Sequence, residues 1–143
     1  MDRVEGIAKE ISLIAPRWIR TMQMGYVLPQ HLTMSQVAVL FATYEQNETT
    51  TSKLSKTMRV SPPTISGIVD RLVRDHYLQR FPDKKDRRVI RIQLTKKGVL
   101  EVKSVFARIQ KKWKSVLILL SPAERETFLG ITKKIVQSAE QRQ

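Results

Sequence analysis

Apolar residues recur at steps of three and four along several stretches of the chain, and this spacing predicts amphipathic helices. The first stretch begins at Val4, and we expect its helix to end near Tyr26. Pro16 lies inside it and has no N–H to donate, so it predicts a kink or a break at that point. The apolar stripe of this helix consists of Val4, Ile7, Ile11, Ile14 and Trp18.

A second helix is predicted to start at Thr33, because Gln36 three residues later completes a capping box. A polar loop over residues 45–50 follows this helix, and Thr50 or Thr51 is suited to cap the next one. The positions expected to be buried in the second helix are Val37, Leu40, Phe41 and Tyr44.

The next two helices are short and are joined by a turn over residues 59–61, which is the pattern of a helix-turn-helix. We expect this turn to bury Val60 between the helices. Ser61 can cap the second helix, and Pro62 or Pro63 can occupy its first turn, where a missing N–H has no cost. The inward positions of the two helices are Leu54, Met58, Ile65, Ile68, Val69 and Leu72.

Two stretches of β type follow, residues 78–81 and residues 89–94. The segment between them, residues 82–88, is polar and basic. A pair of strands with such a connection behind a helix-turn-helix predicts a basic β-hairpin, or wing.

A long helix is expected from Thr95 until Ser121 and Pro122 break it, and Glu124 completes the start signal of a final helix. The first helix and the last two carry apolar stripes, so we expect them to pack together as a separate helical layer. The predicted fold class is mainly α (α+β), a winged helix-turn-helix with a two-stranded β wing plus this N- and C-terminal layer. The apolar positions of the last two helices are Val99, Val102, Phe106, Ile109, Trp113, Val116, Leu120, Phe128, Ile131 and Ile135.

The charge of the chain is concentrated around the predicted wing. The 143 residues, one domain by length, carry a formal net charge of +13. Between Lys53 and Gly98 there are 13 Lys or Arg against 4 Asp, a net charge of +9 in about a third of the chain. A polyanion such as nucleic acid is therefore the expected partner.

Composition also excludes several classes of protein. No stretch approaches the roughly 18 apolar residues of a membrane span, and the N-terminus lacks a signal pattern, so we expect a soluble, cytoplasmic protein. The chain has no cysteine, which excludes disulfides and thiolate metal sites. His31 and His76 have no ligand partners at metal-site spacing, so we expect no cofactor and no metal unless a dimer assembles a site.

The helix-turn-helix and the wing carry motifs that identify a family. They are Ser61, Thr64 and Ser66 with Val69-Asp70-Arg71-Leu72, then Asp86 and Arg88, then Leu94, Thr95 and Gly98. This set resembles the MarR (multiple-antibiotic-resistance regulator) family of bacterial winged helix-turn-helix repressors. The resemblance implies one domain over residues 1–143, with a DNA-binding lobe at 33–98 and a helical dimerisation region at 1–30 and 99–143.

The helix-turn-helix presents a helix N-terminus, with partial positive charge and free N–H groups at Ser61, and we expect this end to enter the major groove. By resemblance, Pro63, Thr64 and Gly67 match positions that face the bases. Gly67 stands where an arginine often reads guanine, which favours closer backbone approach or reading of DNA shape. The residues suited to phosphate contacts in this helix are Ser66, Arg71 and Arg74.

At the wing, Arg88 matches the residue that enters the minor groove in the resembled family, and Asp86 matches the carboxylate that braces it. Lys84, Lys85 and Arg87 are expected to contact phosphates. The family also often binds small aromatic or anionic effectors between its dimer layer and its DNA-binding lobe. The residues approaching that region are Trp18, Met22 and Tyr26, for which core packing is the competing interpretation.

The leading hypothesis is a homodimeric, sequence-specific repressor that binds a pseudo-palindromic operator in double-stranded DNA and is released by a small-molecule effector. The alternative is a non-specific architectural DNA-binding protein. The sequence shows no paired carboxylates and no nucleophile beside a base, which disfavours an enzyme. The basic charge does not lie opposite an amphipathic stripe, which disfavours a membrane-surface role.

Three local alternatives stay open. Lys84 to Arg88 would be a solvated turn if it stood alone. Asp86 could be a turn residue only. Arg71 could pair with Asp75 one helical turn later.

Overall fold

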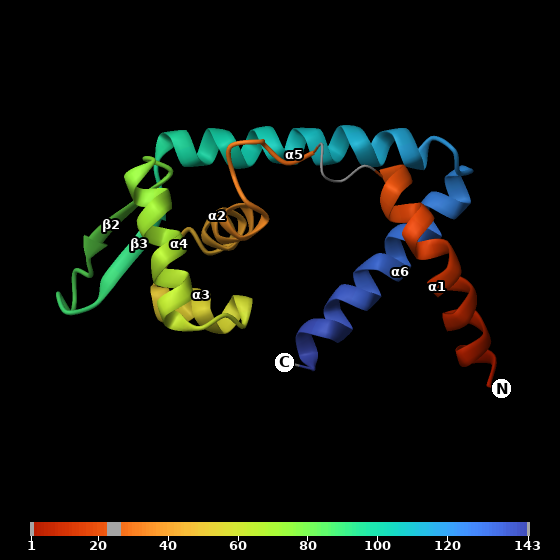
Figure 1. Cartoon of the computed structure of the whole chain (residues 1–143), viewed down its shortest axis with the longest axis horizontal. Coiled ribbons are helices and arrows are strands. Elements are labelled where there is room, and N and C mark those ends of the chain that lie inside the picture. Colours follow the sequence, from red (N-terminus) through yellow and green to blue (C-terminus); the bar gives the residue numbers. More distant parts are fainter. Residues whose placement is uncertain (1, 23–26, 143) are drawn as a thin grey trace. The chain divides into compact units, whose positions relative to one another are not determined.

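The structure is a computed structural model, and it describes residues 2–22 and 27–142 (Figure 1). The chain divides into two compact units, Met1–Arg108 and Ile109–Gln143, and each is described by itself. The protein is mainly helical with one small sheet, as the predicted fold class requires. Its elements are α1 (Arg3–Met22), α2 (Met34–Gln46), β1 (Glu48–Thr49), α3 (Thr51–Met58), α4 (Pro62–Arg74), β2 (Leu78–Pro82), β3 (Ile90–Leu94), α5 (Lys96–Leu117) and α6 (Pro122–Gln141).

The predicted helix starts are confirmed by their caps. At α2 the Gln36 N–H donates to Thr33 Oγ1 at 3.2 Å, and the Thr33 N–H donates to Gln36 Oε1 at 2.8 Å. Of the two candidate caps for α3, it is Thr50 whose hydroxyl accepts the Lys53 N–H. Ser121 and Glu124 form the same reciprocal box at α6. Each cap satisfies backbone groups that the first helical turn cannot pair.

Helix α1 continues through Pro16, so of the kink or break predicted there the break is wrong. Proline removes one helical hydrogen bond, to the carbonyl of Ser12, and α1 is exposed around Ser12, so water can supply that bond. The predicted end of this helix near Tyr26 lies outside the described residues, and the described helix ends at Met22.

The helix-turn-helix is built as predicted around four side chains with no exposed surface, which are Leu54, Ile65, Val69 and Leu72. Met58 and Ile68 are half-buried. Val60 is also only half-buried, so its predicted burial is wrong. Its backbone nevertheless belongs to the turn, because Ser55 Oγ donates to the Val60 carbonyl at 2.6 Å and Arg59 adopts a left-handed conformation, with φ 53°.

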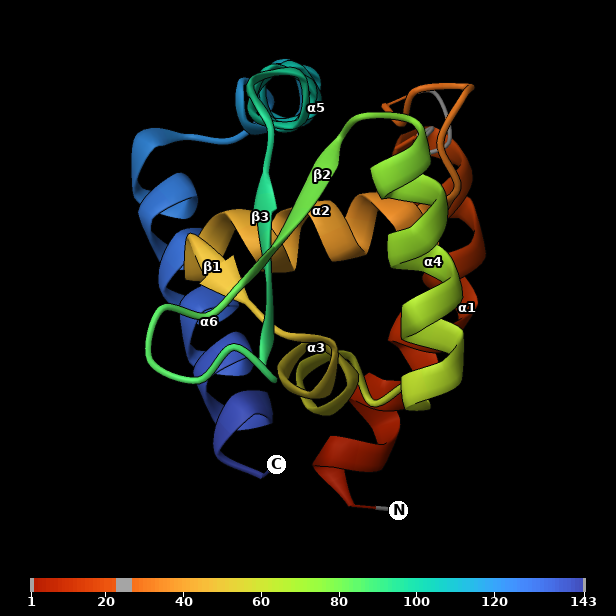
Figure 2. The same cartoon turned by 90° about the vertical axis from the view of Figure 1, so that its left-hand side faces the viewer.

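Helix α2 is buried on more faces than one apolar stripe predicts, because it contacts α3, α4, β1 and β3 (Figure 2). Val37 and Leu40 are buried as expected, and so are Val39, Ala42 and Thr43. The prediction that Tyr44 is buried is wrong, since it is 38% exposed. Its ring lies 5.9 Å from that of Phe106, which is itself 42% exposed, so the two aromatics share one partly covered edge.

The predicted hairpin is present, but it belongs to a sheet of three antiparallel strands in the order β1-β3-β2 (Figure 2). Leu78 pairs with Leu94 at one end of the hairpin and Pro82 pairs with Ile90 at the other. The two-stranded prediction omitted β1, whose Thr49 is buried and pairs with Ile92. A strand of two residues is too short to show the alternation that predicts strands.

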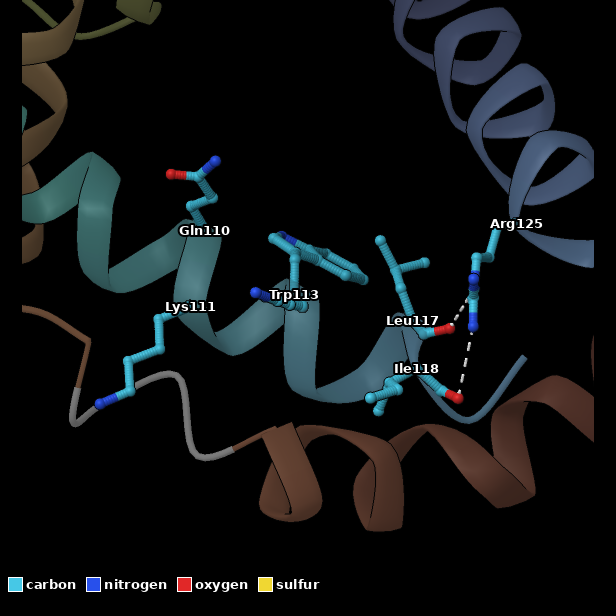
Figure 3. Close-up of a pocket in the computed structure, with 7 residues that line it drawn as sticks. Gln110, Lys111, Trp113, Leu117, Ile118 and Arg125 are labelled. Atoms are coloured by element: carbon cyan, nitrogen blue, oxygen red, sulfur yellow. Dashed lines mark hydrogen bonds between the residues drawn. The ribbon is translucent and has the colours of Figure 1, made fainter. Parts of the chain in front are cut away.

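In the second unit, α5 ends at Leu117, so Leu120 lies beyond the helix in which it was predicted. Residues 118–120 tighten into a turn, in which the N–H groups of Leu119 and Leu120 bond three residues back. The guanidinium of Arg125 on α6 donates to the carbonyls of Leu117, at 2.7 Å, and Ile118, at 3.5 Å (Figure 3). A cation at a helix C-terminus satisfies its unpaired carbonyls and complements the helix dipole.

Candidate nucleic-acid interface

Helix α4 has one buried face and one exposed ridge. Ile65, Val69 and Leu72 are fully buried against the rest of the lobe. In an α-helix, positions that follow one another at steps of four, three and four lie on one side, and the series that starts at Pro63 lies on the side opposite to these buried residues. These ridge residues are Pro63, Gly67, Asp70 and Arg74, and all four are exposed. This ridge, together with the exposed Thr64 at the N-terminal end of the helix, is the part of α4 that a DNA groove can contact.

The N-terminus of α4 is capped by a small hydroxyl cluster. The hydroxyls of Ser61 and Thr64 are hydrogen-bonded to each other at 2.8 Å, and Ser61 Oγ also accepts the Thr64 N–H at 3.4 Å. Pro62 and Pro63 occupy the first turn and have no N–H to satisfy. The helix dipole favours an anion at this end, whose first turn carries no acidic side chain. The free N–H groups predicted here are not found on the first three helical residues, because two are prolines and the Thr64 N–H donates to Ser61.

An ion pair links the exposed ridge of α4 to the sheet. Arg80 Nη1 on β2 lies 2.6 Å from Asp70 Oδ1. Both side chains are at least one-third exposed, so this pair contributes little to stability. It does neutralise a carboxylate that would otherwise repel DNA phosphates. Sequence reasoning missed Arg80, because nothing in the spacing of ten residues indicates that the two elements meet there.

The base of the wing is organised by Asp83, a second residue that sequence reasoning missed. Its carboxylate accepts the N–H of Lys85 at 2.8 Å, the N–H of Asp86 at 3.1 Å and Nε of Arg91 at 2.6 Å. The Asp86 N–H, then Arg91, then the Lys85 N–H lower the pKa of Asp83 from 3.8 to about 2. Asp83 thereby connects the turn at the end of β2 to β3 through Arg91.

The wing arginine is held by the carboxylate predicted to brace it. Asp86 Oδ1 accepts both the Arg88 backbone N–H, at 3.1 Å, and Arg88 Nε, at 3.2 Å, and Asp86 Oδ2 lies 3.4 Å from Nη2. The Arg88 side chain is 92% exposed, so its guanidinium stays available to an outside partner. The contact gives the long arginine side chain one preferred direction before any partner binds.

The remaining predicted DNA-binding residues are distributed around these features. Lys84, Lys85 and Arg87 are exposed on the wing, and Ser66 is half-buried on α4. Arg74 Nε lies 3.4 Å from Asp75 Oδ1, whereas the exposed Arg71 makes no side-chain interaction within the described part of the chain. The alternative pairing of Arg71 with Asp75 is therefore not present.

The charge of Asp83 makes the stability of the wing dependent on pH. Because the folded protein lowers this pKa to about 2, the unfolded state binds more protons than the folded state between about pH 4 and pH 2. The contribution of Asp83 is therefore complete above about pH 4 and is lost as the pH falls through about 2. We expect the stability of the wild type to fall more steeply over this range than that of Asp83→Asn.

Urea unfolding of the two proteins at a series of pH values measures this difference directly. The difference between the two curves reports on Asp83, because its carboxylate is the ionisable group that the substitution removes. Parallel curves would contradict the lowered pKa.

Of the three predicted effector residues, the structure describes Trp18 and Met22. Trp18 is 45% exposed and Met22 is buried, while Tyr26 lies outside the described residues. Within residues 109–143 there is an open hollow of about 730 Å³ (Figure 3). It is lined by Gln110, Lys111, Trp113, Lys114, Leu117, Ile118 and Arg125.

Neither histidine lies in a metal-binding group. His31 Nε2 is 3.6 Å from Glu101 Oε2, and among residues 2–22 and 27–142 no three His, Cys, Asp or Glu side chains gather as metal ligands. In the same part of the chain, no helix combines the length and the hydrophobicity needed to span a bilayer.

Comparison with known proteins agrees with this geometry. The model of the MarR family matches residues 32–90, from two residues before α2 to the first residue of β3. The chain is 28% identical over 127 residues to the HTH-type transcriptional repressor MdtR of Bacillus subtilis, covering 89% of this chain and 79% of MdtR. It is 30% identical over 112 residues to the uncharacterized HTH-type transcriptional regulator YsmB of the same bacterium, covering 78% and 75% of the two chains.

A solved structure extends the similarity to almost the whole fold. The structure of a MarR family protein from Bacillus stearothermophilus superposes with a TM-score of 0.75 at 25% identity. The match covers 96% of this chain and 93% of that one.

Proposed function

The chain belongs to the MarR family of transcriptional regulators, and we propose that it is a homodimeric, sequence-specific repressor that binds double-stranded DNA in the bacterial cytoplasm. The observation that carries this proposal is the pairing of two surfaces in one lobe. One is the exposed, acid-free N-terminus of α4, and the other is the wing on which Asp86 holds the exposed Arg88. The first surface suits a major groove and the second suits the minor groove beside it.

The charge distribution supports this mode of binding. Lys84, Lys85 and Arg87 surround the braced arginine with cations, and Arg71 lies exposed on α4. Such cations release counterions from the phosphate backbone, so we expect affinity to fall steeply with salt. Base edges and groove width then determine which sequence is bound.

A dimer is supported by apolar surface that the single chain leaves exposed. On α1, Ile7 and Ile11 are more than half exposed, and on α6 Ile131 and Ile135 are as well. Leu119, between α5 and α6, is 81% exposed. Several large apolar side chains exposed along one helix are rarely left uncovered on a soluble monomer, so we propose that a second copy of the chain covers each of these segments. Two-fold symmetry would then place two α4 helices in successive major grooves of a pseudo-palindrome, about 34–36 Å apart.

Regulation by an effector follows from linkage in such a dimer. A small aromatic or anionic molecule can bind better to the dimer when its two α4 helices have the wrong spacing for DNA, and it then lowers the affinity of the protein for DNA. By linkage, bound DNA lowers the affinity of the protein for this effector by the same factor. Trp18, Met22 and Tyr26 remain the proposed contacts.

The test is selection of genomic fragments by the purified protein at near-physiological salt, without and then with phenolic ligands. Sedimentation of the protein and of its complex measures the stoichiometry. Recovery of a pseudo-palindromic motif bound by two chains supports the proposal, and loss of binding with a ligand identifies an effector class. Recovery of fragments without a motif, with affinity that depends only on length and salt, would favour an architectural DNA-binding protein instead.

The architectural alternative is favoured by one specific observation. Residues 60–69, which include the first two turns of α4, contain no charged and no amide side chain. A protein that binds DNA only through phosphates needs no base-reading side chain at this end of α4.

A further inference from the structure

The first two turns of α4 lack the residue types that read purines. Arginine or lysine reads guanine, and asparagine or glutamine reads adenine, through paired hydrogen bonds in the major groove. Residues 60–69 are Val-Ser-Pro-Pro-Thr-Ile-Ser-Gly-Ile-Val, and none of these four types is among them. A recognition helix contacts base edges mainly through its N-terminal residues. The part of α4 that enters deepest is therefore without a purine-reading side chain.

The hydroxyl groups at this end are partly used by the helix cap. Thr64 Oγ1 and Ser61 Oγ share one hydrogen bond at 2.8 Å, so at most one of the two O–H groups is free to donate elsewhere. Ser61 Oγ also accepts the Thr64 N–H. Besides the hydroxyl of the half-buried Ser66, what remains for the base edges is apolar, the methyl group of Thr64 and the ring of Pro63. The apolar feature of the major groove is the C5-methyl group of thymine.

The next two charged positions of the ridge are already paired within the lobe. The Asp70 carboxylate accepts from Arg80 at 2.6 Å, and Arg74 lies 3.4 Å from the carboxylate of Asp75. Because Arg80 holds Oδ1 of Asp70, only Oδ2 of this carboxylate is left to accept from a cytosine amino group.

Gly67 makes the ridge smooth between these residues. A Cβ built at Gly67 has no atom within 4 Å, so neither packing nor backbone conformation requires glycine there. The position is exposed and its φ is not positive. Its effect on the surface is to remove a side chain from the centre of the ridge, which lets DNA approach the helix backbone.

We infer that this protein reads its operator in the major groove through thymine methyl groups and groove shape, and that it leaves guanine unread along the first two turns of α4. Thr64 and Gly67 are the residues that determine this specificity. The inference rests on the proposed function, because it assumes that α4 enters the groove of a specific site.

The first experiment modifies single atoms of the selected operator. Deoxyuridine in place of thymidine removes the C5-methyl group, and 7-deazaguanine in place of guanine removes the N7 acceptor. We expect deoxyuridine within the half-sites to weaken binding about five- to tenfold and 7-deazaguanine to change affinity less than about twofold. A loss of tenfold or more with 7-deazaguanine would overturn the inference.

A double-mutant cycle separates methyl contact from effects of the methyl group on DNA shape. Thr64→Ser keeps the capping hydroxyl and removes only the side-chain methyl group, so the deoxyuridine penalty should largely disappear in this variant. A penalty of unchanged size in Thr64→Ser would contradict the assigned contact.

Gly67→Arg tests the same surface by gain of function. Because the space around Cβ is open, the Gly67→Arg variant should fold without strain. It should gain a preference of about tenfold for half-sites with guanine at the base pair that faces position 67. Gly67→Ala is the matched control, since it fills the same position without a donor and should add no preference for guanine. Gly67→Arg with no new preference would show that bases are out of reach and would overturn the inference.

The two levels of proposal fail differently. If the wild type prefers no sequence over random DNA, the proposed function itself is wrong. If it selects a motif but depends on guanine N7, only this inference is wrong.

Discussion

Replacing Gly98 with alanine is expected to lower the free energy of unfolding by about 3 kcal/mol, because the new Cβ would lie 2.1 Å from the carbonyl oxygen of Tyr77. It would also lie 2.8 Å from Leu94 Cδ2. Gly98 cannot move away freely, since its N–H donates to Thr95 Oγ1 at 3.0 Å in the cap of α5. The Thr95 hydroxyl in turn donates to the carbonyl of His76 at 2.6 Å. The start of α5 is therefore held against the turn that precedes β2 at a distance only glycine permits.

Urea unfolding of the wild type and the variant measures this loss. Gly67→Ala is the matched control, because it makes the same chemical change at a helical glycine with nothing within 4 Å of the new Cβ. Alanine is favoured over glycine in a helix, so this variant should gain up to about 1 kcal/mol. Equal stability of Gly98→Ala and Gly67→Ala would show that the two glycines have similar surroundings, contrary to the structure.

Features set by neighbouring residues were predictable from the sequence. The capping boxes at Thr33 and Ser121 need only residues three positions apart, and the burial of Leu54, Ile65, Val69 and Leu72 follows from helical periodicity. Helical periodicity alone did not predict burial correctly where it depends on which other elements pack against a helix. A single stripe cannot show that α2 is covered from several sides, nor that Tyr44 lies at the uncovered edge.

The candidate site divides in the same way. Motifs predicted four of the site residues, Thr64, Gly67, Asp86 and Arg88. In the structure Asp86 accepts a hydrogen bond from Arg88, two residues later in the chain. Asp83 and Arg80 were missed because their partners are distant in sequence or on another element. An Asp at the end of a strand predicts a turn, but nothing in the spacing predicts that Arg91 will reach it across the hairpin.

Arg88→Ala is expected to weaken binding to the selected operator about 10- to 100-fold and to reduce any preference for A·T pairs beside the half-sites. The physical reason is that a narrow A·T minor groove concentrates negative potential, to which an inserted guanidinium responds. Arg88 meets this requirement because Asp86 directs it while leaving 92% of its side chain exposed. Affinities for operators with A·T or G·C pairs at the flanks, measured at several salt concentrations, give both effects.

Arg87→Ala is the matched control, since it removes the same charge from the adjacent exposed position, for which the described part of the chain shows no bracing carboxylate. If Arg87 contacts only phosphates, its loss should weaken binding to all sequences alike and reduce the salt dependence by about one counterion. The A·T preference then distinguishes the two arginines, because removal of either reduces affinity but only removal of Arg88 reduces discrimination. Arg88→Ala with unchanged affinity and unchanged preference would mean that the wing arginine does not enter the groove, and the bracing contact with Asp86 would then stabilise only the turn.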